Sequence, residues 1–81
     1  MVFVKIIGEE NGVYTAEYRP ESRDAAPGIV SFNPETDERE IVEISPDDHM
    51  DASWYRGHAF MALRRMTAQD PIQEEGESFW L

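Results

Sequence analysis

Residues 2–19 read VFVKIIGEENGVYTAEYR, and this stretch indicates a β-hairpin. A run rich in β-branched residues, Val2 to Ile7, is separated from an alternating run, Val13 to Arg19, by a segment that contains Asn11-Gly12. Asn-Gly between two such runs is the strongest short-range hairpin signal. The sequence therefore predicts two antiparallel strands joined by a tight turn.

The register of this hairpin has two solutions. A two-residue turn at Asn11-Gly12 puts Lys5 on the same face as the tyrosines of the second run. A three-residue loop, with Gly12 in the left-handed region and forming a bulge, instead puts Lys5 opposite Glu17. Such an opposite-charge pair contributes roughly 0.2–1 kcal/mol, so we expect the bulged loop.

Two further strands are expected beyond an exposed loop, PESRDAAP, at residues 20–27. The third strand is Gly28 to Asn33, and a turn follows in which Pro34 presets φ and Asp37 tolerates a left-handed conformation. The fourth is Arg39 to Ser45, and its register stays open because both parities leave one apolar side chain outward. Short links between four strands predict an antiparallel meander.

A helix follows the strands. Ser45-Pro46-Asp47-Asp48 has the residue types of a helix start, although Asp51 or Ser53 could cap a helix that begins one turn later. The helical segment continues through Gln69, and Pro71 stops it. We therefore predict an α+β fold, ββββα, with the C-terminal helix packed on one face of the sheet. Residues 1–70 form the single domain, and residues 71–81 form an acidic tail ending in Phe-Trp-Leu.

The helix has one face with the pattern of a core. Its residues, placed 100° apart, group small and apolar side chains that let a helix sit close to a sheet. They are Tyr55, Ala59, Ala62, Leu63 and Met66. The side chains expected to face them from the sheet are Val4, Ile6, Tyr14, Ala16, Tyr18, Val30, Phe32, Val42 and Ile44. Those expected to point away are Phe3, Ile7, Val13, Ile29 and Ile41, which makes a sheet-to-sheet dimer a second way to self-associate.

A second helical stripe is the candidate interaction surface. It consists of Trp54, His58, Met61 and Arg65, with Phe60 nearly opposite the core face. Either Phe79, Trp80 and Leu81 fold back over it, or it meets a second copy or another protein, since aromatic residues, Met and Arg are enriched at interface cores. The residues leave both alternatives open.

Charge and composition exclude several classes of partner. The 81 residues include 7 Lys and Arg against 17 Asp and Glu, a formal net charge of -10, and no cysteine. Nucleic-acid binding requires basic residues to displace counterions from phosphates, so no nucleic-acid partner is expected. No apolar run approaches the ~20 residues that span a bilayer. We expect a cytoplasmic protein with no membrane partner.

The sequence predicts no catalytic, cofactor or metal site. Asp47, Asp48, His49 and Asp51 are the compact group of potential ligands, but they lack the glycine turn and terminal Glu of a calcium loop. His58 is a lone histidine with no legible Ser-His-acid spacing. We expect no enzyme.

The leading hypothesis is a small, acidic, non-catalytic protein-interaction module that forms a homodimer or binds another protein. The second is an acidic decoy or inhibitor that caps a basic macromolecular surface, which the charge of -10 permits. The third is a small metal-dependent accessory enzyme centred on Asp47, His49 and Asp51.

Overall fold

The structure is a computed structural model of the chain and describes residues 1–49 and 54–80. The predicted hairpin is formed by β1 (Val2–Glu10) and β2 (Val13–Pro20). The two residues between them both have positive φ, 53° at Asn11 and 85° at Gly12. A two-residue turn of this kind matches the right-handed twist of the flanking strands, which is why Asn-Gly favours it.

The register of the hairpin is the predicted one, but the bulge that produces it lies in β1 and not in the loop. Lys5 lies opposite Glu17, as expected. The loop itself has only two residues, and the register shifts inside β1, between Ile6 and Gly8. The extra residue is therefore Ile7, whose bulge keeps the apolar positions before it facing the helix.

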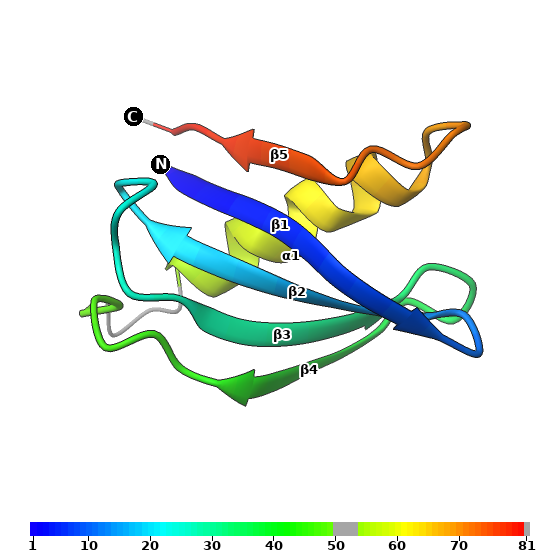
Figure 1. Ribbon diagram of the computed structural model, residues 1–81, viewed down its shortest axis with the longest axis horizontal. Coiled ribbons are helices and arrows are strands. Elements are labelled where there is room, and N and C mark those ends of the chain that lie inside the picture. Colours follow the sequence, from blue (N-terminus) through cyan, green and yellow to red (C-terminus); the bar gives the residue numbers. More distant parts are fainter. Residues whose placement is uncertain (50–53, 81) are drawn as a thin grey trace.

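The sheet continues as the predicted meander, through β3 (Gly28–Asn33) and β4 (Glu38–Glu43). The strand order is β4-β3-β2-β1-β5, and every neighbouring pair is antiparallel. The fifth strand, β5 (Glu75–Ser78), pairs with β1 and closes the side of the sheet opposite β4 (Figure 1). The sheet therefore has five strands instead of the four predicted.

The tail, residues 71–81, was predicted as an acidic extension, and this is wrong for its central part. The helix-side positions of β5 are Gly76 and Ser78, which pair with the buried Val4 and Val2 of β1. A Cβ at Gly76 would lie 2.8 Å from the sulfur of Met66, so a larger residue there requires the Met66 side chain to move. Small residues at both inner positions remove the apolar alternation by which a strand is recognised.

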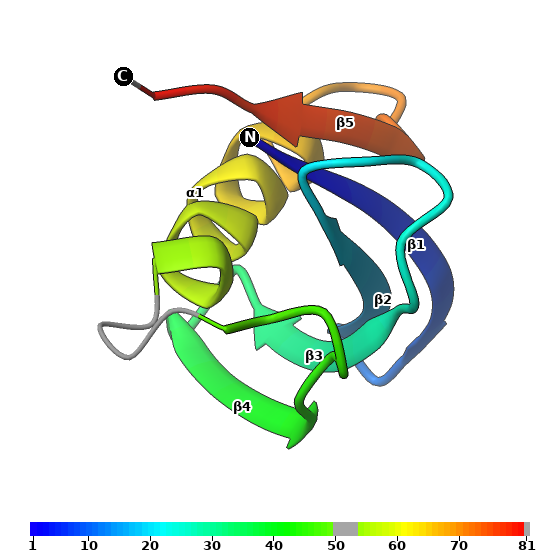
Figure 2. The same cartoon turned by 90° about the vertical axis from the view of Figure 1, so that its left-hand side faces the viewer.

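The helix α1 (Trp54–Thr67) packs on one face of the sheet, as predicted. Ala59 and Ala62 are fully buried, and Tyr18 of β2 is fully buried on the facing side. Figure 2 shows β1, β2 and β3 curving round this helix. Among the described residues, the buried core comprises Val2, Val4, Ala16, Tyr18, Val30, Phe32, Ala59, Phe60, Ala62, Leu63 and Met66.

The predicted helix start at Ser45 is wrong, and long-range hydrogen bonds explain why. The Ser45 hydroxyl donates to the carbonyl of Ala26 and accepts from the amide of Asp47 at 3.0 Å. The Asp47 carboxylate in turn accepts from the amide of Ala26 at 2.8 Å. These contacts hold residues 45–47 in a turn beside the loop that precedes β3. The alternative caps, Asp51 and Ser53, lie outside the described residues.

Four apolar side chains differ from their predicted positions. Phe60 is only 6% exposed, because the curved sheet covers a wider arc of the helix than a flat sheet would. Ile41 pairs with the buried Val30 and so takes the helix side of the sheet. Val42 and Ile44, predicted to face the core, are exposed. The register shift between Ile29 and Val30 places Val42 as an extra residue of β4.

One further observation bears on membranes. Within residues 1–49 and 54–80, no helix has the length and apolar character needed to cross a bilayer.

Candidate functional site

The predicted stripe of α1 and the end of the tail form one continuous surface, which we call the helix–tail face. β5 runs beside α1 and contacts it, and both figures of the whole molecule show the two elements side by side (Figures 1 and 2). The residues of this face are Trp54, His58, Met61, Arg65, Phe79 and Trp80.

The centre of the helix–tail face is a stack of three aromatic rings. The imidazole of His58 lies between two indoles, with centroids 6.2 Å from Trp54 and 4.0 Å from Trp80. The planes are nearly parallel, inclined by 9° and 12°. Trp80 also meets Tyr55 edge to face, at a centroid separation of 5.6 Å. Such ring pairs each contribute about 0.5–1.5 kcal/mol beyond the area that they bury.

Polar contacts fasten β5 to the same helical stripe. The Nδ1 atom of His58 lies 3.2 Å from the hydroxyl of Ser78. The guanidinium of Arg65 donates to the backbone carbonyl of Glu77. Two of the four stripe residues therefore serve an intramolecular purpose, which is to position the strand that follows the helix.

The intramolecular explanation of the stripe is confirmed for part of it, and the intermolecular one stays a prediction for the side chains left exposed. Trp80 folds back on His58, which is the intramolecular alternative. Three large apolar side chains of the face nevertheless stay exposed: Trp54 at 47%, Met61 at 57% and Phe79 at 61%. Phe60, the fifth candidate, is buried in the core and does not belong to the surface. Leu81 lies outside the described residues.

An open depression adjoins the helix–tail face, and its lining is balanced in charge. The lining includes His58, Met61 and Phe79 together with residues of β1, β2 and β5. Its fully charged residues are four basic and four acidic: Lys5, Arg19, Arg23 and Arg65, and Glu17, Asp24, Glu75 and Glu77. The chain carries a formal charge of -10, so that whole excess resides outside this lining.

The contact between Ser78 and His58 has the residue types of a nucleophile and a base, and sequence spacing did not reveal it. The Ser78 side chain is buried, and the imidazole is stacked with the indoles of Trp54 and Trp80. Among the residues that the structure describes, no carboxylate is hydrogen-bonded to this imidazole to orient it. An activated serine needs access to substrate and an oriented base, so the arrangement suits packing better than acyl transfer.

A buried polar network joins the segment after β4 to the sheet and the helix. The Tyr18 hydroxyl donates to Asp48 at 2.9 Å and accepts from the amide of Ser45 at 3.0 Å. Arg56 of α1 pairs with the same carboxylate at 3.1 Å. Burial, opposed by the Ser45 amide and supported by Asp48, raises the pKa of Tyr18 to about 12. This network is a structural anchor that replaces the predicted helix start.

The possible metal ligands noted in the sequence, Asp47, Asp48, His49 and Asp51, do not act together: two of them make separate structural hydrogen bonds. Asp47 accepts a backbone amide, and Asp48 belongs to the Tyr18 network. Asp51 lies outside the described residues. Within the described ranges, no group of three or more His, Cys, Asp or Glu residues is placed to hold a metal ion.

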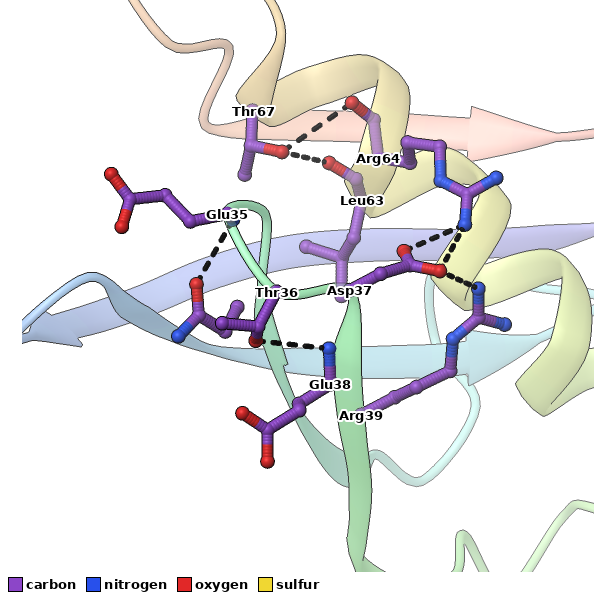
Figure 3. Close-up of polar contacts among 9 residues, drawn as sticks. Glu35, Thr36, Asp37, Glu38, Arg39, Leu63, Arg64 and Thr67 are labelled. Carbon is purple, nitrogen blue, oxygen red and sulfur yellow. Dashed lines mark hydrogen bonds and ion pairs between the residues drawn. The ribbon is translucent and has the colours of Figure 1, made fainter.

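A second polar cluster fastens the β3–β4 turn to α1 (Figure 3). Asp37 has a φ of 63°, the left-handed conformation expected for it. Its carboxylate lies 2.6 Å from Arg64 of the helix and 3.2 Å from Arg39 of β4. The two guanidiniums, Arg64 foremost, hold the pKa of this carboxyl below its usual value. The cluster is exposed and lies beside the helix–tail face without joining it.

Comparison of the chain with protein-family models, with curated proteins and with solved structures finds no match to any of them.

Proposed function

We propose that this protein is a non-catalytic interaction module that associates with a second copy of itself through the helix–tail face. The observation that carries the proposal is the exposure of Trp54, Met61 and Phe79 around one aromatic stack. Aromatic and Met side chains are the types enriched at interface centres, where desolvated anchors supply most of the binding energy.

Rigidity supports the same proposal. The exposed Trp54 rests on His58, which rests on Trp80, and Ser78 and Arg65 fasten β5 to the helix. A surface that is already ordered loses little conformational entropy on binding, so more of its contact energy appears as affinity.

Electrostatics favour a second copy as the partner on this face. Two chains that each carry a charge of -10 repel one another over most of their surfaces. The depression beside the helix–tail face is lined by equal numbers of basic and acidic residues, so two copies meet there without net repulsion.

The test is the molar mass in solution as a function of concentration, by light scattering and sedimentation equilibrium. We expect the wild-type mass to rise toward twice that of one chain. Trp54→Ser and Met61→Ser should each raise the dimer dissociation constant at least about tenfold, since interface anchors contribute ~2 kcal/mol or more.

Ile7→Ser is the matched control, because Ile7 is 51% exposed and lies at the bulge of β1, outside the face. The control variant should dimerise like the wild type. A monomer at every concentration, or an equal loss of association in Ile7→Ser, would contradict the proposal.

A further inference from the structure

The free edge of β4 has a chemical character that the other edge of the sheet lacks. β4 pairs with β3 on one side, and within the described residues no strand pairs with its other side. Unpaired N–H and C=O groups along such an edge form a template for another strand. The question is which chain segment this edge fits.

Ile41 lies on the helix side of this edge and is followed along the chain by two further apolar residues. Ile41, which pairs with the buried Val30, is 42% exposed, and Val42 and Ile44 are exposed at 57% and 52%. Three large apolar side chains lie within four consecutive positions, two on β4, whose every residue is exposed, and one directly after it. A strand laid beside β4 would cover them.

The opposite side of the same edge is acidic. Glu38 and Glu40 pair with Asn33 and Ser31, and Glu43 pairs with Ile29. These β3 residues alternate with the buried Val30 and Phe32, so the three carboxylates share the face that points away from the helix. The one basic residue of β4, Arg39, lies on the helix side, where it pairs with Asp37.

The edge formed by β5 shows the usual means of protection against strand addition. β5 has four residues, two of them glutamates, and no large apolar side chain. A four-residue edge offers few free backbone groups to a partner strand, whereas β4 has six residues and carries apolar side chains among its charged ones, so strand addition is expected at β4.

We propose that β4 binds an extended segment of another protein in which Lys or Arg alternates with β-branched apolar residues. Backbone hydrogen bonds continue the sheet, the basic side chains face Glu38, Glu40 and Glu43, and the apolar ones cover Ile41, Val42 and Ile44. A second copy of β4 does not fit, because pairing on matched faces sets its glutamates against these glutamates. The site is separate from the helix–tail face and does not depend on self-association there.

The probe is a nine-residue peptide of alternating Lys and Val, acetylated and amidated, titrated into the isotope-labelled full chain and followed by nuclear magnetic resonance. We expect saturable shifts at the amides of β4 and protection of these amides from hydrogen exchange. A peptide methylated at every second backbone nitrogen, on the hydrogen-bonding edge, should lose binding, and a peptide of alternating Glu and Val should not bind.

Charge-reversal variants distinguish specific binding of the peptide at the β4 edge from its general attraction to an acidic protein. Glu40→Lys with Glu43→Lys should weaken binding of the Lys-Val peptide at least about tenfold, since two cross-strand charge pairs become repulsive. Glu75→Lys with Glu77→Lys makes the same change of charge on β5 and should weaken binding less than twofold. The dispersion of the amide spectrum checks that each variant is folded.

Equal weakening in both pairs of variants would mean non-specific attraction and would overturn the proposal. Shifts confined to β5, unchanged binding of the methylated peptide, or no binding at all would overturn it as well.

Discussion

The imidazole of His58 lies flat against the indole of Trp80, with centroids 4.0 Å apart and planes inclined by 12°. This contact joins the middle of the helix to the segment that follows β5. It also separates the residues of the helix–tail face by purpose: Trp80 holds the fold together, whereas Trp54, Met61 and Phe79 remain available to a partner.

Trp80→Ala should lower the free energy of unfolding by about 2 kcal/mol, because it removes a stacked and an edge-to-face ring pair together with partial burial. Urea denaturation measures the change. Phe79→Ala, at a neighbouring residue that is 61% exposed, should cost less than about 0.5 kcal/mol. Equal costs for the two variants would show that the stack is not part of the folded state.

Gly28→Ala should destabilise the fold by roughly 3 kcal/mol or more, because the new Cβ would lie 2.2 Å from Cε1 of Tyr18 and 2.6 Å from the amide nitrogen of Ser45. Gly57→Ala is the matched control in the helix, where nothing lies within 4 Å of the new Cβ. It should stabilise the protein by about 0.5–1 kcal/mol through helix propensity. Thermal and urea unfolding of both variants test the pair, and a stable Gly28→Ala protein would contradict the packing described.

Stability should fall as the pH rises from 10 to about 12, the interval between the ordinary pKa of tyrosine and that of Tyr18. In this interval the unfolded chain loses the phenolic proton while the folded chain retains it, so deprotonation favours unfolding. Each pKa unit corresponds to about 1.4 kcal/mol, which puts the total loss near 2–3 kcal/mol. The check is urea denaturation across this range, together with the ultraviolet absorbance of phenolate.

Tyr18→Phe is the control for this alkaline loss. It should be less stable than the wild type at neutral pH, because Asp48 and the Ser45 amide lose a hydrogen-bond partner, and its stability should decline less between pH 10 and 12. The same slope in both proteins would assign the alkaline transition to another group.

Asp37→Asn should lower stability at neutral pH and have little effect in strong acid. Arg64, and to a lesser degree Arg39, lower the pKa of this carboxyl, so its contribution exists above the ordinary value of 3.8 and disappears as the pH falls through the lowered pKa. Asn tolerates the left-handed backbone at this position, so the turn itself is retained. The urea midpoint of Asp37→Asn should lie below that of the wild type at neutral pH and equal it at acidic pH. Asp24→Asn, in the exposed loop, is the control and should match the wild type at both pH values.

Much of the sheet follows from local pattern. Strand alternation and Asn11-Gly12 predict the hairpin, the opposite charges of Lys5 and Glu17 select its register, and both are found. The alanines of the helix likewise predict which side meets the sheet. These features could be predicted because each depends on side chains a few residues apart or directly opposite one another.

The candidate site was only partly predictable. The stripe that contains Trp54, His58, Met61 and Arg65 is visible from helical spacing, but the burial of Phe60 depends on how far the sheet curves, and curvature has no local sequence signal of comparable strength. The pairing of His58 with Ser78 joins residues 20 positions apart, which no spacing rule connects.

The amino-acid sequence alone was sufficient for the four-strand meander, the register of the hairpin and the buried side of the helix, because periodicity and turn chemistry act over short distances along the chain. Tertiary packing alone established β5, the turn at Ser45 and the aromatic stack. β5 forms by pairing with β1, and its inner residues, Gly76 and Ser78, contact Met66 and His58 of the helix, which are their neighbours only once the helix has packed on the sheet.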